Sequence, residues 1–283
     1  MGSGYEISWV HSHHLKKSSS TINTRSWCVC VSHQLNLTIM GRFTSPPAPP
    51  PTPPAILDNG LADFLVLSTP EMKNMCMFFF LWMIVAANQS KTVKDFCSCL
   101  LASAGGGILI PIFLNDLPVF LKSETFLVYL MANFLLFKYL PGLRDLTKGS
   151  TTLLLFASFC AETFRANAVC AFVTAGMNAV GGTGEVFSFP LFAPIICGTL
   201  GGCGGGFFPL SKGLAPLDNG LNSKQRTALV GAIFFHLYTQ TQKPLSAELA
   251  VMAGKMIVSV YFIFVAVSAE LSQPTFIAKA KAS

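Results

Sequence analysis

Two oppositely charged residues, Glu162 and Arg165, stand inside a long apolar stretch of this sequence. They are three positions apart, so in a helix they share a face and can form an ion pair. If the stretch spans a membrane, each charge costs at least about 2.5–3.5 kcal/mol unless it is paired. We therefore consider two interpretations: a structural ion pair that faces the inside of a helix bundle, or a polar site beside a transport path or a lipid headgroup.

Three further ionisable residues lie within apolar stretches. Lys138 is near the end of its stretch, and Lys255 is about one third of the way into its own. Both side chains are long enough to reach the membrane surface, which is where we expect their charges. His236 has no carboxylate near it on the same predicted helix, which favours a buried bundle residue over a proton carrier.

The common catalytic and metal-binding motifs are absent from the sequence. It contains no G-x-S-x-G, no H-E-x-x-H, no phosphate-binding loop and no paired acids at helical spacing. Cys28-Val-Cys30 and Cys97-Ser-Cys99 lack the C-x-x-C spacing of zinc and redox sites. We predict that the protein is not an enzyme, has no catalytic residues and binds no metal.

A pair of glycine triplets reveals an internal repeat with an offset of 99 residues. Gly105–Gly107 matches Gly204–Gly206, and the register continues without a gap into the next apolar stretch, where Tyr139 matches Tyr238. Chance triplets are easy to find in a glycine-rich chain, but a gapless register across two predicted helices is not. The two halves of the chain therefore share one architecture.

Each triplet is followed by a proline, Pro111 in the first half and Pro209 in the second. Glycine costs about 1 kcal/mol and proline about 3 kcal/mol in a helix in water. We predict that both helices bend at the triplets and turn carbonyl groups towards a polar path. Ser103 and Thr199, which are close by, either line this path or bond to their own helix backbone. The alternative is that the glycines only allow close helix packing.

The composition sets the class of protein. Charged residues make up 11% of the 283 residues, against about 25% in soluble proteins, and hydrophobic residues make up 52%. This excludes an ordinary soluble enzyme, a disordered regulator and a coiled coil. The net charge is +6, but the basic residues are scattered along the sequence, so we expect no nucleic-acid partner. A polytopic membrane protein remains.

Seven apolar stretches predict an all-α protein with seven transmembrane helices. They cover residues 72–89, 95–114, 125–141, 151–175, 187–210, 226–241 and 247–268. The repeat covers helices 1–3 and 4–6. Three helices per unit is an odd number, so the second unit enters the membrane from the opposite face and the repeat is inverted. The seventh helix lies outside the repeat.

We divide the chain into a Ser-, His- and Pro-rich tail (1–55), a transmembrane domain (56–270) and a short basic C-terminal tail (271–283). The acid-poor N-terminal tail resembles either a disordered segment or an organelle transit peptide.

Basic residues near the helix ends predict the orientation in the membrane. The loops on the C-terminal side carry nine, whereas the opposite loops carry only Lys73, Lys122 and Lys243. This predicts a cytosolic C-terminus. Of the glycosylation sequons at Asn36 and Asn88, only Asn36 is then expected to be usable.

At its glycine clusters and its Glu162–Arg165 motif, the chain resembles the trimeric intracellular cation (TRIC) channel family and its prokaryotic relatives. The similarity is carried by Ala104-Gly-Gly-Gly-Ile-Leu, Gly201-Gly-Cys-Gly-Gly-Gly-Phe and Glu162-x-x-Arg165, and it covers about residues 72–268. The resemblance implies a homotrimer in which each protomer conducts potassium past glycine-kinked helices 2 and 5. It also implies an endoplasmic-reticulum membrane, where potassium balances charge during calcium release, and a phosphoinositide bound by the helix 4 motif.

The chain departs from the family pattern at three places. The lysine before the glutamate is Ala161 here, which weakens the expected lipid site. Ile110-Pro111 and Pro209-Leu210 replace the Arg-Asp that prokaryotic relatives carry after the glycines. The lysine before the second glycine cluster is also missing, with Gly201 in that region.

From these observations we expect a potassium channel of an intracellular membrane without a cofactor, apart from a possible phosphoinositide. One alternative is a secondary transporter for a small amino acid such as glycine, with the broken helices as its substrate site. Another is a scaffold whose glycine-rich faces only pack.

Overall fold

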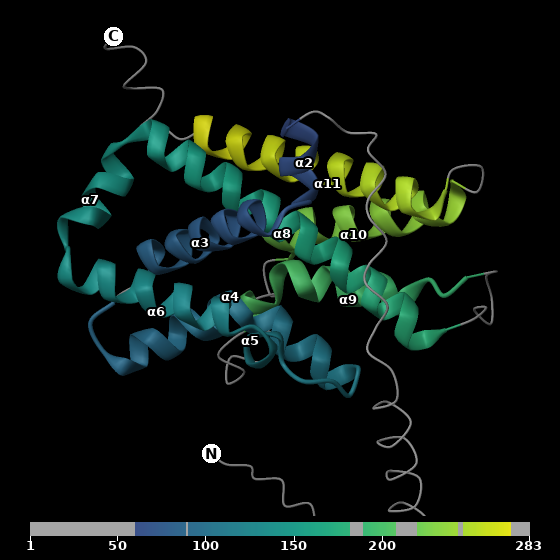
Figure 1. Ribbon diagram of the computed structural model, residues 1–283, viewed down its shortest axis with the longest axis horizontal. Coiled ribbons are helices and arrows are strands. Elements are labelled where there is room, and N and C mark those ends of the chain that lie inside the picture. The colour runs from purple at the N-terminus through teal and green to yellow at the C-terminus, as the bar shows by residue number, and fades with distance from the viewer. Residues whose placement is uncertain (1–59, 89, 182–188, 208–219, 243–245, 273–283) are drawn as a thin grey trace, which may run out of the picture. The chain divides into compact units, whose positions relative to one another are not determined.

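The computed structural model describes residues 60–88, 90–181, 189–207, 220–242 and 246–272 (Figure 1). All of these belong to the second of two units into which the chain divides, Met1–Pro54 and Ala55–Ser283. The described residues form helices and contain no strand. The predicted tail 1–55 and most of the predicted tail 271–283 lie outside them.

Every predicted span coincides with a helix in the described part of the chain. These helices are α3 (Pro70–Ala87), α4 (Val93–Phe113), α6 (Glu124–Tyr139), α8 (Thr151–Val180), α9 (Phe192–Cys203), α10 (Ser223–Thr241) and α11 (Ala247–Leu271). The prediction missed the short helices α2 (Gly60–Val66), α5 (Val119–Lys122) and α7 (Gly142–Gly149). A 3-10 turn, η1 (Gly204–Phe207), continues α9.

Side chains in the connections fix where several helices begin. Thr92 and Asp95 form a reciprocal capping box at α4, with the Asp95 N–H donating to Thr92 Oγ1 at 3.2 Å and the Thr92 N–H donating to Asp95 Oδ2 at 2.9 Å. Asn222 and Gln225 make the same arrangement at α10. Because these caps satisfy N–H groups that a helix start leaves free, they set the helix boundaries.

Three described helices, α4, α8 and α11, are long and apolar enough to cross a membrane on length and composition alone. The pair α6 and α7 would add a fourth if it formed one span, although the two are bent by 101°. The remaining helices at predicted spans, α3, α9 and α10, do not meet this criterion. Polar residues such as Lys224 and Arg226 occupy the first turn of α10.

The helix contacts repeat between the two halves. In the first half α3 packs against α4 and α6, and in the second half α8 packs against α9 and α10. The two halves meet through α3 against α8 and through α4 against α9 and η1 (Figure 1). The seventh span, α11, packs mainly on α8 and α10. This is the arrangement expected for two three-helix units plus one helix.

Each half also has its own apolar core. The first core lies between α3, α4 and α6 and contains Leu81, Trp82, Val85 and Leu130. The second lies between α8, α10 and α11 and contains Val169, Val173, Phe235, Val258 and Phe262.

Candidate ion path and charged site

The two glycine triplets of the repeat meet where α4 crosses α9 and η1 (Figure 1). A β-carbon added to Gly105 would lie 2.5 Å from the backbone nitrogen of Gly205. One added to Gly106 would lie 2.5 Å from the carbonyl oxygen of Leu200. Any side chain at these positions would collide with backbone, so the glycines let the two helices touch directly.

These contacts are reciprocal under the repeat. Gly105 faces Gly205, and Gly204, the counterpart of Gly105, faces Gly106, the counterpart of Gly205. A pseudo-two-fold axis through the crossing gives this pattern, because the same patch then meets itself in both directions. The contacts therefore support the inverted repeat that the odd number of helices per unit predicts.

The interruption predicted at Gly105–Gly107 is absent, because α4 continues as an α-helix through the triplet and through Pro111. Pro111 is the third residue from the end of α4, so it disturbs the end of the helix and not its middle. In the second half the α-helix does give way to 3-10 geometry at Gly204. Pro209 lies outside the described residues. The change of helix geometry thus occurs in one half only.

The remaining predicted path residues have different surroundings. A β-carbon on Gly107 would be 3.1 Å from Val119, whereas one on Gly206 would have no atom of the other described residues within 4 Å. The Ser103 hydroxyl donates to the Cys99 carbonyl at 2.8 Å, and the Thr199 hydroxyl donates to the Ile195 carbonyl at 2.7 Å. Both hydroxyls thus bond to their own helices, which was the alternative interpretation.

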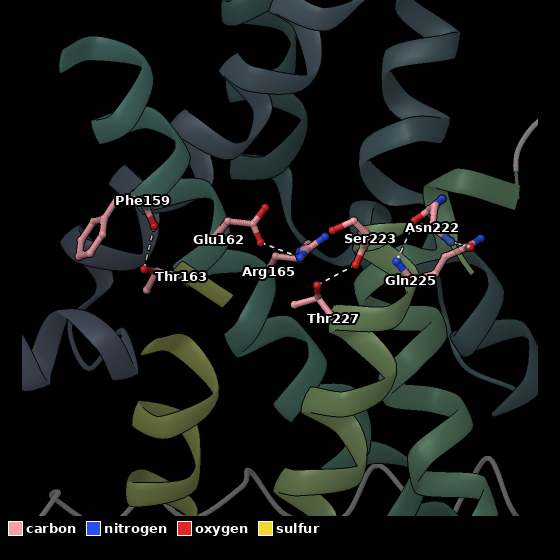
Figure 2. Close-up of polar contacts among 8 residues, drawn as sticks. All are labelled: Phe159, Glu162, Thr163, Arg165, Asn222, Ser223, Gln225 and Thr227. Atoms are coloured by element: carbon pink, nitrogen blue, oxygen red, sulfur yellow. Dashed lines mark hydrogen bonds and ion pairs between the residues drawn. The ribbon is translucent and has the colours of Figure 1, made fainter. Parts of the chain in front are cut away.

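The predicted ion pair is formed within α8. Arg165 Nη2 lies 2.7 Å from Glu162 Oε2, and the two side chains are 9% and 13% exposed (Figure 2). Between the two charged residues, the Thr163 hydroxyl donates to the carbonyl of Phe159, one turn earlier in α8, at 2.9 Å. The pair is therefore almost completely enclosed by neighbouring helices.

Three other helices surround this pair. The Arg165 guanidinium lies over the Phe262 ring of α11, 4.7 Å from its centre, as in a cation–π contact. Figure 2 shows the pair beside the first turn of α10, which Asn222 and Gln225 cap. Lys224 belongs to the same turn of α10, and α9 also packs on α8.

Arg165 has unused donors. Its Nε and Nη1 atoms are buried and make no hydrogen bond to another described residue, and the same holds for the Gln225 Nε2 atom. Buried guanidinium N–H groups are costly to leave unpaired. Free donors beside the start of α10 suit an anionic group, because a helix N-terminus carries partial positive charge.

The other ionisable residues follow the expectations in part. Lys138 is exposed at the end of α6, as predicted, with its ammonium 5.6 Å from the centre of the Tyr139 ring. Lys255 is half-buried within α11, so its side chain is not fully exposed. His236 is fully buried and packs edge-on against Phe189 at 5.4 Å.

Sequence reasoning missed two sets of polar contacts. Arg144 of α7 donates to the Asn88 carbonyl at 2.6 Å and ties α7 to the end of α3. Asn167 of α8 and Ser259 of α11 both donate to the Leu65 carbonyl of α2, each at 2.8 Å. For Asn167 and Ser259 the only signal in the sequence was a polar residue on an apolar helix, and Arg144 lies on the polar helix α7, where nothing singled it out.

Comparison with known proteins is informative at the level of structure. No protein-family model and no curated protein matches the sequence. The fold is similar to that of a TRIC counter-ion channel solved to explain activity in calcium release, with a TM-score of 0.57, 18% identity, and coverage of 73% of this chain and 98% of that one. It is also similar to a trimeric intracellular cation channel from C. elegans solved without Ca2+, with a TM-score of 0.53, 15% identity, and coverage of 75% and 98%.

The described residues therefore have an all-helical fold that is similar to the fold of solved TRIC channels. The resemblance that the glycine clusters and the Glu162–Arg165 motif predicted is confirmed at the level of fold.

Proposed function

We propose that this protein is a monovalent cation channel that conducts potassium through each protomer of a homotrimer. The observation that carries the proposal is the reciprocal glycine crossing between two inverted halves, within a fold shared with solved cation channels. Inverted halves that meet near the middle of the bundle are common where membrane proteins move ions. The neighbour described as a counter-ion channel in calcium release supports the same role here, as a counter-ion flow across an intracellular membrane such as the endoplasmic reticulum.

The proposed path runs beside the crossing and not between the crossing helices. Gly105, Gly106, Gly204 and Gly205 are in backbone contact and leave no room for an ion. Gly206 has open space beside it, and η1 has the irregular backbone that a polar path requires. Ser103 and Thr199 stay as candidate lining groups, because their oxygens can still accept contacts from an ion's water.

We further propose that a lipid with an anionic headgroup, such as a phosphoinositide, binds at Arg165. The free Nε and Nη1 donors, the nearby Lys224 and the start of α10 support this assignment. Ala161 in place of the family's lysine removes one expected contact, so Arg165 and Lys224 would carry the charge.

The orientation with a cytosolic C-terminus is part of the same proposal, as is an intracellular membrane. Import into another organelle, directed by the N-terminal tail as a transit peptide, is the alternative location.

Reconstitution of the full chain into liposomes and planar bilayers tests the proposal. Ohmic single-channel current under a potassium gradient is the expected result. Saturable, ion-coupled glycine uptake without unitary currents would instead establish the transporter. If correctly folded protein showed neither kind of flux, only the scaffold hypothesis would remain.

A further inference from the structure

The short helix α2 (Gly60–Val66) is held in the bundle by contacts that the proposed function does not use. Its residues Ala62, Leu65 and Val66 are buried, and it packs against α11 and α8. The Phe64 ring stacks on Phe159 of α8, with ring centres 5.1 Å apart and planes at 18°. α2 thus contributes apolar contact to both helices.

Polar bonds hold the end of α2. The Leu65 carbonyl accepts a hydrogen bond from Asn167 Nδ2 of α8 at 2.8 Å and another from Ser259 Oγ of α11 at 2.8 Å. Ser259 is fully buried, and the Asn167 Nδ2 and Ser259 Oγ atoms are 3.4 Å apart. One carbonyl group of α2 therefore joins α8 to α11.

The chain makes a tight turn just after this point. Leu67 has a positive φ of 54°, and the Ser68 N–H donates to the Asp63 carbonyl at 3.0 Å. Thr69 then caps α3. Helices α2 and α3 are thus two separate helices with a tight turn between them, and the turn presents the Leu65 carbonyl to Asn167 and Ser259.

These contacts bracket the charged site. Phe159 is three residues before Glu162, and Asn167 is two residues after Arg165. On α11, Ser259 is three residues before Phe262, so the two lie on the same face. On that face, Ser259 donates a hydrogen bond to α2, and the Phe262 ring contacts the Arg165 guanidinium. Because α2 ties α8 to α11 here, it fixes the spacing across which Arg165 reaches Phe262.

We propose that α2 is a latch whose Leu65 carbonyl, held by Asn167 and Ser259, positions the Arg165 guanidinium over Phe262. Asn167 and Ser259 are therefore positioning residues for the charged site. The inference depends on the proposed function only in assigning Arg165 to a functional site.

The first test is hydrogen–deuterium exchange of the full-length protein, read on the α2 amides. Ser259→Ala removes one donor to Leu65, and Asn167→Ala removes the other from a different helix. Either change should make these amides exchange at least about tenfold faster, because the latch then opens locally. The matched control is Ser268→Ala, nine residues further along α11 and about 14 Å away at helical rise. Unchanged exchange in both Ser259→Ala and Asn167→Ala would overturn the latch.

The second test asks whether the latch positions Arg165. Arg165→Lys keeps the charge but loses the planar group that stacks on Phe262. Introduced into the wild type, Arg165→Lys should lower the melting temperature. Introduced into Ser259→Ala or Asn167→Ala, it should lower the melting temperature less, because the stacking is already disturbed in these variants. In the Ser268→Ala control, Arg165→Lys should lower the melting temperature as much as it does in the wild type. Additive effects of Arg165→Lys with both latch variants would overturn the positioning role.

Neither test measures ion flux. The absence of potassium current would contradict the proposed channel function. The proposed role of α2 would still be tested by hydrogen exchange and by the melting temperatures of the variants.

Discussion

At the residue scale, the glycines of the repeat have separate roles that their sequence pattern does not distinguish. Gly106 and Gly205 are in backbone contact with the opposite half, whereas Gly206 faces open space. Gly107 lies between these extremes, next to the Val119 side chain. In the sequence each triplet is a single motif. Only the packing distinguishes the glycines at the helix crossing from the glycine beside the proposed path.

Gly106→Ala should therefore destabilise the protein, whereas Gly206→Ala should not. The alanine β-carbon at 106 would meet the Leu200 and Gly201 carbonyls at 2.5 and 2.6 Å. Backbone cannot move as a side chain can, so we expect a cost of about 1–3 kcal/mol. Thermal unfolding in detergent measures it. Equal melting temperatures for the two variants would show that the crossing is looser than described.

The Glu162–Arg165 pair should behave as a buried ion pair. Glu162→Gln or Arg165→Met alone leaves one buried charge without its partner, at an expected cost of about 3–5 kcal/mol. The double variant should recover most of this loss, because neither charge remains. Chemical or thermal unfolding of the three variants checks the cycle. If the double variant were as unstable as the sum of the single ones, the two residues would not be coupled.

At the element scale, the glycine triplet does not interrupt α4, and this has a physical reason. Peptide scales in water give glycine a cost of about 1 kcal/mol in a helix. In a membrane, breaking the helix would instead expose backbone groups that each cost several kcal/mol. Helix α4 keeps its hydrogen bonds through Gly105–Gly107, and the missing side chains serve close packing.

The short helices α2, α5 and α7 were missed because four to eight residues are too few for a reliable helical pattern. Helix α2 owes its place to the Asn167 and Ser259 contacts, which join residues about 100 and 190 positions apart in sequence. The long apolar helices were predictable because their composition alone demands burial or lipid. The contact of Arg165 with Phe262 of α11 was not predictable, since nothing in the sequence brings this helix to α8.

Helix α7 offers a test of one such long-range contact. Arg144 donates to the Asn88 carbonyl at 2.6 Å and its guanidinium lies 5.9 Å from the Phe137 ring centre. Arg144→Met should release α7 and raise hydrogen exchange in residues 142–149 several-fold. Lys148→Met, on an exposed position of the same helix, is the control. Similar exchange in both variants would mean that Arg144 does not anchor α7.

At the scale of the whole molecule, the inverted architecture follows from sequence arithmetic, and the reciprocal contacts support it. A repeat of three helices must reverse its direction in the membrane, and the Gly105–Gly205 and Gly204–Gly106 contacts are those of a pseudo-two-fold axis. The sequence could not show whether the crossing bends helices or packs them. That answer required the positions of both halves together.

The orientation of the whole bundle is testable by glycosylation. Expression in a secretory-pathway membrane should give glycan on Asn36 and none on Asn88, if the C-terminus is cytosolic. Asn88 also caps α3 through its side chain, which donates to the Ile84 carbonyl at 2.8 Å. Replacing each asparagine by glutamine and following the gel shift identifies the modified site. Glycan on Asn88 would reverse the orientation.

The central claim, a cation path beside the glycine crossing, is tested most directly by single-channel recording of Gly206→Leu. A leucine at 206 enters open space, so the fold should be retained while the path is blocked. Gly149→Leu, which also meets no atom within 4 Å of its β-carbon but lies at the end of α7, is the matched control. We predict unitary potassium currents from the wild type and Gly149→Leu, and none from folded Gly206→Leu. Wild-type currents from Gly206→Leu would contradict the path.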